Sequence, residues 1–317
     1  MPFVATHSPL LGTDVEIRVD ADPEAALAAD AAAVAEFERL TAVFSIYDES
    51  SELSRWRRGD IDECSAELTE ALAAAEAWHA ASGGAFHPAI HPLQLRWQHA
   101  AAEDVLPDPA ELAELAASCV TLPFTAADGR IERTADCTGV DLNAIAKGYI
   151  VDRVAAIAFA VPQVDAVMIN ASGDLRHLGR GSVLVGIEDP AARFEGTDPR
   201  WRVQLAQAGL STSGVGKRGF RVAGQSFARV IDPRTGWPVS HTTSASVVAA
   251  DAMTADVLST VMAVLAPEKA FSMAEEEGWA CLLVGADGAE RMSLTWPSTD
   301  RQSTSEDELE PETGRFE

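Results

Sequence analysis

Two side chains in the last third of the sequence, Asp256 and Thr260, have types and spacing that could bind a metal ion and a phosphate. They lie four residues apart in the apolar segment 252–265. The apolar pattern predicts a helix, on which both side chains share one face. Carboxylate and hydroxyl oxygens suit Mg²⁺, which often shares its ligand shell with substrate phosphates. An acid that caps the helix or meets solvent fits the same spacing, so the residues alone leave both interpretations open.

A second candidate segment begins at Asp141 and contains Lys147. Apolar residues recur at near-helical intervals from 143 to 159, which predicts a helix there. Free N–H groups at its start, together with Lys147, could hold a phosphate. The plainer interpretation makes Asp141 a helix cap and Lys147 a solvated charge, and local physics favours it.

Three polar segments and a histidine pair are weaker candidates. Segments 170–174, 211–214 and 231–236 combine Gly with Asn, Asp, Ser or Thr, which allows a ligand to approach but is also typical of turns. His87 and His91 are four residues apart, but a proline follows each. Prolines would break a helix that aligned the two rings, so loop or core histidines are the better prediction.

Composition and missing motifs exclude several classes of protein. The chain has 24 basic and 49 acidic residues, a formal net charge of −25, and such a field repels nucleic acid and anionic membranes. A phosphate ligand must therefore be held locally. A P-loop glycine motif and a serine nucleophile elbow are absent. The four cysteines lack CxxC spacing, which favours buried thiols over a zinc site.

Hydrophobic periodicity predicts an α+β fold, because strands and helices do not alternate regularly. We expect strands at 11–20, 119–124, 130–133, 165–169, 183–187, 201–205, 245–249 and 280–284, and helices at 23–43, 66–82, 109–118, 143–159, 252–265 and 268–276. Residues 85–99 are expected to be irregular. We predict a single domain over 1–297 and a disordered acidic tail over 298–317. The absence of a signal-like N-terminus and of a long apolar run predicts a cytoplasmic protein.

Taken in order, nine segments between about residues 10 and 285 resemble the ApbE family of FAD:protein FMN transferases. They are 11–13, 44–55, 84–88, 141–153, 170–174, 186–190, 212–214, 231–236 and 252–260. Each is weak alone, but their common order makes the resemblance specific.

The resemblance implies an α+β fold with mixed sheets flanked by helices and a flavin cleft between two halves. It implies a Mg²⁺-dependent enzyme that cuts FAD, transfers FMN to a Thr or Ser hydroxyl of a target protein and releases AMP. The metal would be bound by Asp256, Thr260 and the carbonyl of Ala144, with Ser259 close by. FAD would contact Leu11, Tyr47, Ala85, Phe86, His87, Asp141, Lys147 and Val230.

The chain departs from the family pattern at a position taken to be catalytic. Arg229 stands where the family has a histidine that serves as the base for the incoming hydroxyl. Arginine stays protonated and cannot be that base, although it could steady a phosphate. His87 replaces a family Asp, and either His87 or His241 could substitute as base. Two alternative functions therefore stay open: an FAD-binding protein without transferase activity, and an FAD pyrophosphatase that yields FMN and AMP.

Overall fold

The structure is a computed structural model that describes residues 2–192, 198–214 and 219–297. The segment 298–317, predicted to be an acidic tail, lies outside these residues. No helix within the described ranges is long and apolar enough to cross a bilayer.

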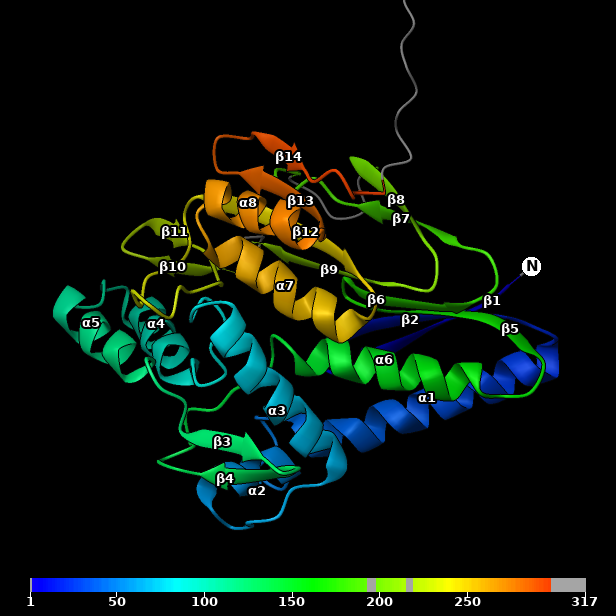
Figure 1. The fold of residues 1–317 in the computed structure, drawn as a ribbon, viewed down its shortest axis with the longest axis horizontal. Coiled ribbons are helices and arrows are strands. Elements are labelled where there is room, and N and C mark those ends of the chain that lie inside the picture. The colour runs from blue at the N-terminus through cyan, green and yellow to red at the C-terminus, as the bar shows by residue number, and fades with distance from the viewer. Residues whose placement is uncertain (1, 193–197, 215–218, 298–317) are drawn as a thin grey trace, which may run out of the picture.

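An eight-stranded antiparallel sheet forms the centre of the fold (Figure 1). Its order is β1 (Phe3–Leu10), β2 (Thr13–Ala21), β5 (Val164–Ala171), β6 (Asp174–Gly179), β9 (Gly209–Gly214), β12 (Thr242–Ala249), β13 (Ala280–Gly285) and β14 (Glu290–Met292). In β2 the buried residues Val15, Ile17 and Val19 alternate with more exposed ones, as a half-buried strand requires. This arrangement confirms the α+β class and the strand predicted near 11–20.

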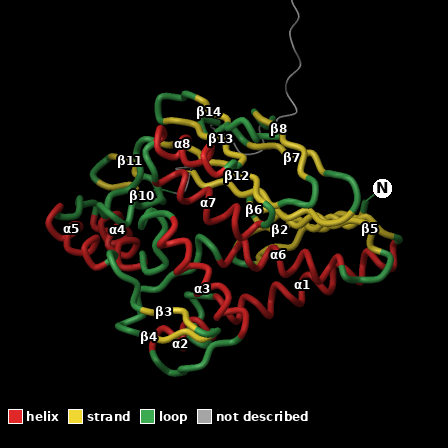
Figure 2. Tube along the Cα trace, in the orientation of Figure 1, coloured by secondary structure: helices red, strands yellow, loops and turns green. Residues whose placement is uncertain are grey.

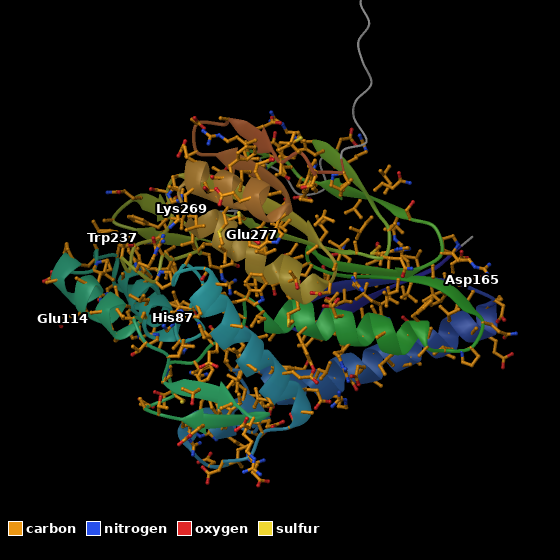
Figure 3. All side chains as sticks on the ribbon, viewed as in Figure 1. His87, Glu114, Asp165, Trp237, Lys269 and Glu277 are labelled. Carbon is orange, nitrogen blue, oxygen red and sulfur yellow. The ribbon has the colours of Figure 1, made fainter. Side chains whose placement is uncertain are left out.

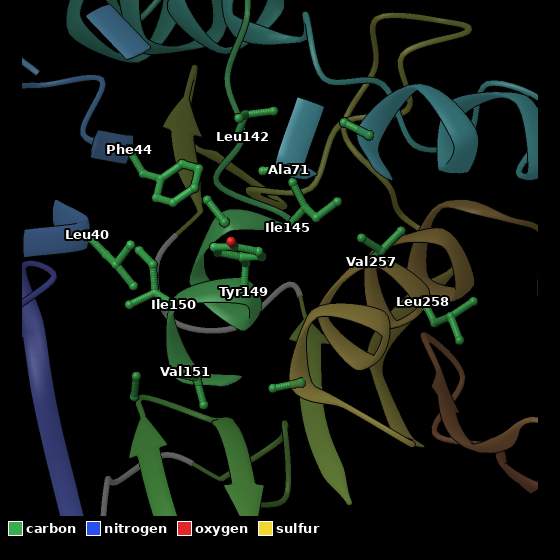
Figure 4. Close-up of a cluster of buried hydrophobic side chains, with 14 of the residues drawn as sticks. Leu40, Phe44, Ala71, Leu142, Ile145, Tyr149, Ile150, Val151, Val257 and Leu258 are labelled. Atoms are coloured by element: carbon green, nitrogen blue, oxygen red, sulfur yellow. The ribbon is translucent and has the colours of Figure 1, made fainter. Parts of the chain in front are cut away.

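Helices cover one face of this sheet, and a hairpin packs on the other. α1 (Pro23–Phe44), α6 (Ala146–Phe159), α7 (Ala252–Val264) and α8 (Pro267–Glu277) form the helical layer (Figures 1 and 2). In β5 Ile169 faces their core, whereas Met168 faces a second cluster with the hairpin β7 (Val183–Ile187) and β8 (Trp201–Leu205). Figure 4 shows Tyr149 of α6 among Leu40, Phe44 and Ile145 in the helical core.

A mainly helical region adjoins this layer and consists of residues from two distant parts of the chain. It contains α2 (Glu52–Arg58), α3 (Ala66–Ala81), α4 (His91–Glu103), α5 (Pro109–Ser118), β3 (Phe124–Ala127), β4 (Arg130–Arg133), β10 (Phe220–Val222) and β11 (Gln225–Phe227). Trp97 of α4 packs against Phe220 and Phe227 of the β10–β11 hairpin. A third buried cluster thereby joins α4 and α5 to the segment that contains Arg229.

The structure corrects three predicted boundaries. Residues 85–99 are not irregular throughout, because α4 begins at His91, where Pro92 falls in the first turn and breaks no internal hydrogen bond. No strand spans 119–124, since β3 begins only at Phe124. The helix predicted from 143 begins at Ala146, after a turn in which Leu142 O accepts from the backbone N–H groups of Ile145 and Ala146.

Candidate functional site

Lys147 and Asp174 form an ion pair that links the start of α6 to the start of β6. The Asp174 side chain is 3% exposed and also accepts a hydrogen bond from the Ser211 hydroxyl of β9. The interpretation of Lys147 as a solvated surface charge is therefore wrong. The structure instead fixes a cation beside the first turn of α6, which has no side-chain cap.

Asp256 lies buried on α7 and faces the start of α6. Its Oδ2 accepts the N–H of Gly148 at 3.1 Å. Gly148 is the third residue of α6, so its N–H has no acceptor within the helix, and Asp256 supplies one. Burial raises the pKa of Asp256, and the nearby charge of Lys147 opposes the rise. The predicted alternatives of a capping or solvent-facing acid are wrong, because the N-cap of α7 is Asp251.

Hydroxyl groups of α7 and β9 complete this cluster. Ser213 Oγ lies 2.8 Å from Ser259 Oγ and 3.2 Å from Thr260 Oγ1. Ser259 Oγ also lies 3.2 Å from Ser211 Oγ, which connects the hydroxyls to Asp174. We call this set the α6–α7 polar centre: Lys147, Asp174, Ser211, Ser213, Asp256, Ser259 and Thr260.

Backbone contacts around Ala252 fix the start of α7 in this position. A Cβ placed on Gly148 of α6 would lie 2.4 Å from the oxygen of Ala252, and one placed on Gly209 of β9 would lie 2.4 Å from its nitrogen. Asp152 of α6 accepts from the N–H groups of Ala252 and Met253 at 2.9 and 2.8 Å. Burial raises the pKa of Asp152 to about 6, although these hydrogen bonds oppose the rise. Glycine and an acid cap thus allow the two helices to cross closely.

The donor set of the α6–α7 polar centre fits Mg²⁺ better than a transition metal. The described residues contain no group of three or more His, Cys, Asp or Glu side chains arranged for a metal ion. The available donors are instead the Asp256 carboxylate and the Thr260 and Ser259 hydroxyls, to which the resemblance adds the carbonyl of Ala144. These hard oxygen ligands, few in number, suit a cation that completes its shell with water and substrate phosphates.

The residues predicted to contact FAD differ in exposure and come from several elements. Leu11 lies in the turn between β1 and β2, and Val230 packs against the main core. Tyr47 is 79% exposed in the segment between α1 and α2. The side chains of Ala85 and Phe86 are buried, so the backbone of this segment is the part that a ligand can contact.

A cavity of about 530 Å³ lies between α3, α5 and the turn at 232–236. Its lining includes His79, Gly84, Cys119, Arg234 and small residues of both helices, and none of the predicted FAD contacts. The turn itself is confirmed, because Asp232 O accepts from Gly236 N at 2.8 Å. This cavity is separate in its residues from the α6–α7 polar centre.

The five residues from His87 to His91, which we call the histidine turn, pack against the segment that ends in Asp141. Asp141 N donates to Pro88 O at 2.6 Å, and His91 N donates to Gly139 O at 3.3 Å. Asp141 is buried, and its Oδ1 accepts from Asn143 N at 2.8 Å. It is therefore not the cap of α6, as the plainer interpretation had it. Burial raises its pKa, which the Asn143 hydrogen bonds and the charges of His91 and Arg57 oppose.

His87 is buried at the other end of this turn, on the side of the molecule that carries α4 (Figure 3). Its Nδ1 accepts from Ala89 N at 3.0 Å, so the proton of the neutral ring is on Nε2. That Nε2 is buried and has no hydrogen-bond partner among the described residues. Burial lowers the pKa of His87 to about 4, helped by His79, whose ring lies edge-on at 4.6 Å.

The remaining candidate bases lie elsewhere. His241 Nε2 is 2.9 Å from Leu265 O, and the residue lines a different cavity with Pro267 and Asp287. Arg229 is exposed just after β11, and the described residues provide its side chain with no hydrogen bond or ion pair.

Comparison with known proteins decides the family. The model of the ApbE family matches residues 11–283. The chain belongs to the ApbE family. A Haemophilus influenzae protein named FAD:protein FMN transferase is 31% identical over 267 residues, covering 77% of this chain and 75% of the relative. A Vibrio cholerae protein of the same name is 28% identical over 260 residues, covering 78% and 76%. The crystal structure of the ApbE protein from Thermotoga maritima superposes with a TM-score of 0.82 at 27% identity, covering 93% of this chain and 98% of that one.

Several contacts of this ApbE site were not predicted from the sequence. Lys147 and Asp174 were each singled out, but their pairing depends on how α6 packs across the sheet. The contact of His91 with Asp141 joins segments far apart in the chain. The signal that could have linked them is chemical: a buried acid and a loop histidine both require partners.

Proposed function

We propose that this chain is a Mg²⁺-dependent FAD:protein FMN transferase, which moves FMN from FAD to a Thr or Ser hydroxyl of a target protein and releases AMP. Family membership and the names of its relatives support the reaction. One structural observation carries the proposal. Asp256 and Thr260 of α7, which the resemblance names as metal ligands, lie in one polar cluster with Lys147 at the start of α6.

The chain's own residues would bind and orient the pyrophosphate of FAD. Asp174 holds Lys147 in the first turn of α6, where its ammonium group favours phosphate oxygens. Asp256, Thr260 and the Ala144 carbonyl would hold Mg²⁺ with Ser259 nearby. When bound, the ion would neutralise the charge that develops on the phosphates. Local binding of this kind suits a chain of net charge −25.

The flavin contacts belong to the same proposal. The exposed ring of Tyr47 is free to stack on an aromatic ring system. Leu11, Val230 and the backbone of 85–87 would border the flavin and adenosine parts, and Asp141 would accept hydrogen bonds from them. We also propose a cytoplasmic location, with FAD and an acceptor protein as the partners.

Mass spectrometry of a defined reaction tests the proposal. The purified chain would be incubated with FAD, Mg²⁺ and an acceptor protein that an ApbE-family transferase is known to modify. We expect covalent FMN on the acceptor, equimolar AMP, and neither product when a chelator replaces Mg²⁺. Absence of AMP under all conditions would falsify the proposed reaction. AMP and free FMN formed without an acceptor would assign the pyrophosphatase instead.

Arg229 favours one alternative, a protein that binds FAD without transferring FMN. This exposed cation stands at the family's base position and cannot accept a proton. The alternative predicts that bound FAD stays intact through prolonged incubation with Mg²⁺ and acceptor. Any turnover of that FAD eliminates it.

A further inference from the structure

The proposed transfer needs a group that takes the proton of the acceptor hydroxyl, and the structure excludes the obvious histidines. His87 already uses its acceptor nitrogen, Nδ1, to bond Ala89 N. Its low pKa of about 4 also makes it a weak base at neutral pH. His241 bonds Leu265 O and lines a cavity outside the α6–α7 polar centre.

His91 has the geometry that the other two lack. Its Nδ1 is buried and lies 3.9 Å from Oδ2 of Asp141, while its side chain as a whole is 22% exposed. The exposed part of the side chain therefore does not include Nδ1. Asp141, with a side chain that is 1% exposed, favours a proton on Nδ1, which leaves the lone pair on Nε2. The 3.9 Å separation exceeds a hydrogen bond, but such contacts in ligand-free sites often shorten when substrate binds.

The histidine turn is held firmly beside the proposed metal-binding segment. The two backbone hydrogen bonds, Asp141 N to Pro88 O and His91 N to Gly139 O, fix His91 against Asp141. Asp141 and Ala144 are three residues apart, so their Cα atoms are separated by at most about 11 Å. The turn in which Ile145 N bonds Leu142 O shortens this distance further. His91 and the Ala144 carbonyl thus belong to one compact part of the site.

We propose that His91 is the catalytic base of this chain and that Asp141 is its positioning residue. The inference rests on the proposed FMN transfer and specifies which residue replaces the base that Arg229 cannot be. It also gives a role to a histidine that the family resemblance does not assign.

In the proposed step, the acceptor hydroxyl oxygen forms a bond to the phosphorus of the FMN half, and its proton passes to Nε2 of His91. The bond from that phosphorus to the bridging oxygen breaks, and AMP leaves with this oxygen and its electron pair. The imidazolium of His91, facing Asp141, then releases its proton to solvent.

The test compares kcat and KM for FAD in His91→Ala, His79→Ala and His99→Ala. His99 is an exposed residue of α4, the helix that His91 begins, and serves as the matched control. We expect His91→Ala to lower kcat at least about 100-fold, as loss of a general base does. The KM for FAD should stay within about two-fold. Imidazole added to the buffer should restore part of the rate in this variant alone.

A second variant tests the role of Asp141. Asp141→Asn should lower kcat by a larger factor in the wild-type chain than in His91→Ala, because part of its effect is exerted through the imidazole ring. An equal factor in both backgrounds would overturn the positioning role. An unchanged kcat in His91→Ala, a rise in KM without imidazole rescue, or loss of rate in His79→Ala instead would overturn His91 as base. A wild-type protein that never releases AMP would instead defeat the proposed function itself, and the base with it.

Discussion

The α6–α7 polar centre and the histidine turn both bury polar groups, but the two regions differ in whether these groups have partners. In the centre, Lys147 pairs with Asp174, and Asp256 accepts from Gly148 N. In the histidine turn, His87 Nε2 and His91 Nδ1 are buried without a hydrogen bond among the described residues. The charges of Lys147 and Asp174 are paired before any ligand arrives, whereas the turn leaves hydrogen-bonding capacity unused.

This difference separates groups that hold the fold together from groups that await a ligand. A buried polar group without a partner costs folding free energy, and sites that bind ligands commonly tolerate that cost. Satisfied charges, by contrast, fix the geometry in which a metal and a pyrophosphate can be received. Substitutions in both regions can separate these two kinds of group.

Asp256→Asn should have the largest effect, because it removes the one carboxylate of the proposed metal-binding set. We expect FMN transfer to fall at least about 100-fold at saturating FAD, or about 2.7 kcal/mol in the barrier. The metal-free variant should nevertheless melt at a higher temperature than wild type at pH 8. Burial raises the pKa of Asp256 in the fold, so its contribution to stability is present at low pH and lost as pH rises through that pKa.

The readouts are AMP release and thermal melting with and without Mg²⁺. Glu277→Gln, an exposed acid at the end of α8, is the control and should change neither. Full activity in Asp256→Asn would remove Asp256 from the metal-binding set.

Lys147→Met should destabilise the centre by leaving Asp174 buried without its cation. Breaking a buried ion pair costs about 3–5 kcal/mol, and the 35% exposure of Lys147 reduces our expectation to about 2 kcal/mol. Urea unfolding measures the change. Adding Asp174→Asn to the variant should recover part of the loss, since no unpaired charge is then left. A double variant no more stable than Lys147→Met would show that the pair does not organise the centre.

Asp152 should make the free energy of unfolding depend on pH. Its pKa is about 6 in the fold and lower in the unfolded chain, so the fold binds the proton more tightly. The stabilisation contributed by Asp152 is complete below the pKa that this residue has in the unfolded chain. The free energy of unfolding should therefore fall as pH rises from 4 to about 6. Asp152→Asn, which still accepts a backbone N–H, should flatten that slope. An unchanged slope in chemical denaturation between pH 4 and 7 would contradict the assignment.

His87→Asn should affect stability least, by no more than about 0.5 kcal/mol. The Asn oxygen can accept from Ala89 N as His87 Nδ1 does, while the unpartnered Nε2–H disappears. FAD affinity, measured by fluorescence titration, should fall about ten-fold if that N–H binds the ligand. Loss of stability without loss of affinity would place His87 among the groups that hold the fold.

The sequence predicted the elements with clear periodicity and missed those that depend on their neighbours. α1, α3, α5, α7 and α8 follow from apolar spacing, and β2, β5 and β12 from alternating or apolar runs. β9 is a run of Gly, Ser and Thr that becomes a strand only because β6 and β12 flank it. α4 was missed because the prolines of the histidine turn suggest a break, although Pro92 is tolerated in a first turn.

The candidate site shows the same division. Asp256 and Thr260 can be recognised as a pair from the sequence because residues four positions apart on a helix share a face. The ion pair of Lys147 with Asp174 and the contact of His91 with Asp141 depend on tertiary packing. No pattern in a single chain encodes the distance between such segments.

Gly148 of α6 and Gly209 of β9 both lie against the backbone of Ala252, and this close packing affects how the enzyme adapts to its substrates. Main chain meets main chain at Gly148 and at Gly209, so no side chain is present there that could change rotamer and let α7 slide. The positions of Asp256 and Thr260 are therefore fixed relative to α6 and β9. Adjustment to differently shaped acceptor proteins is left to less restrained side chains, such as the exposed ring of Tyr47.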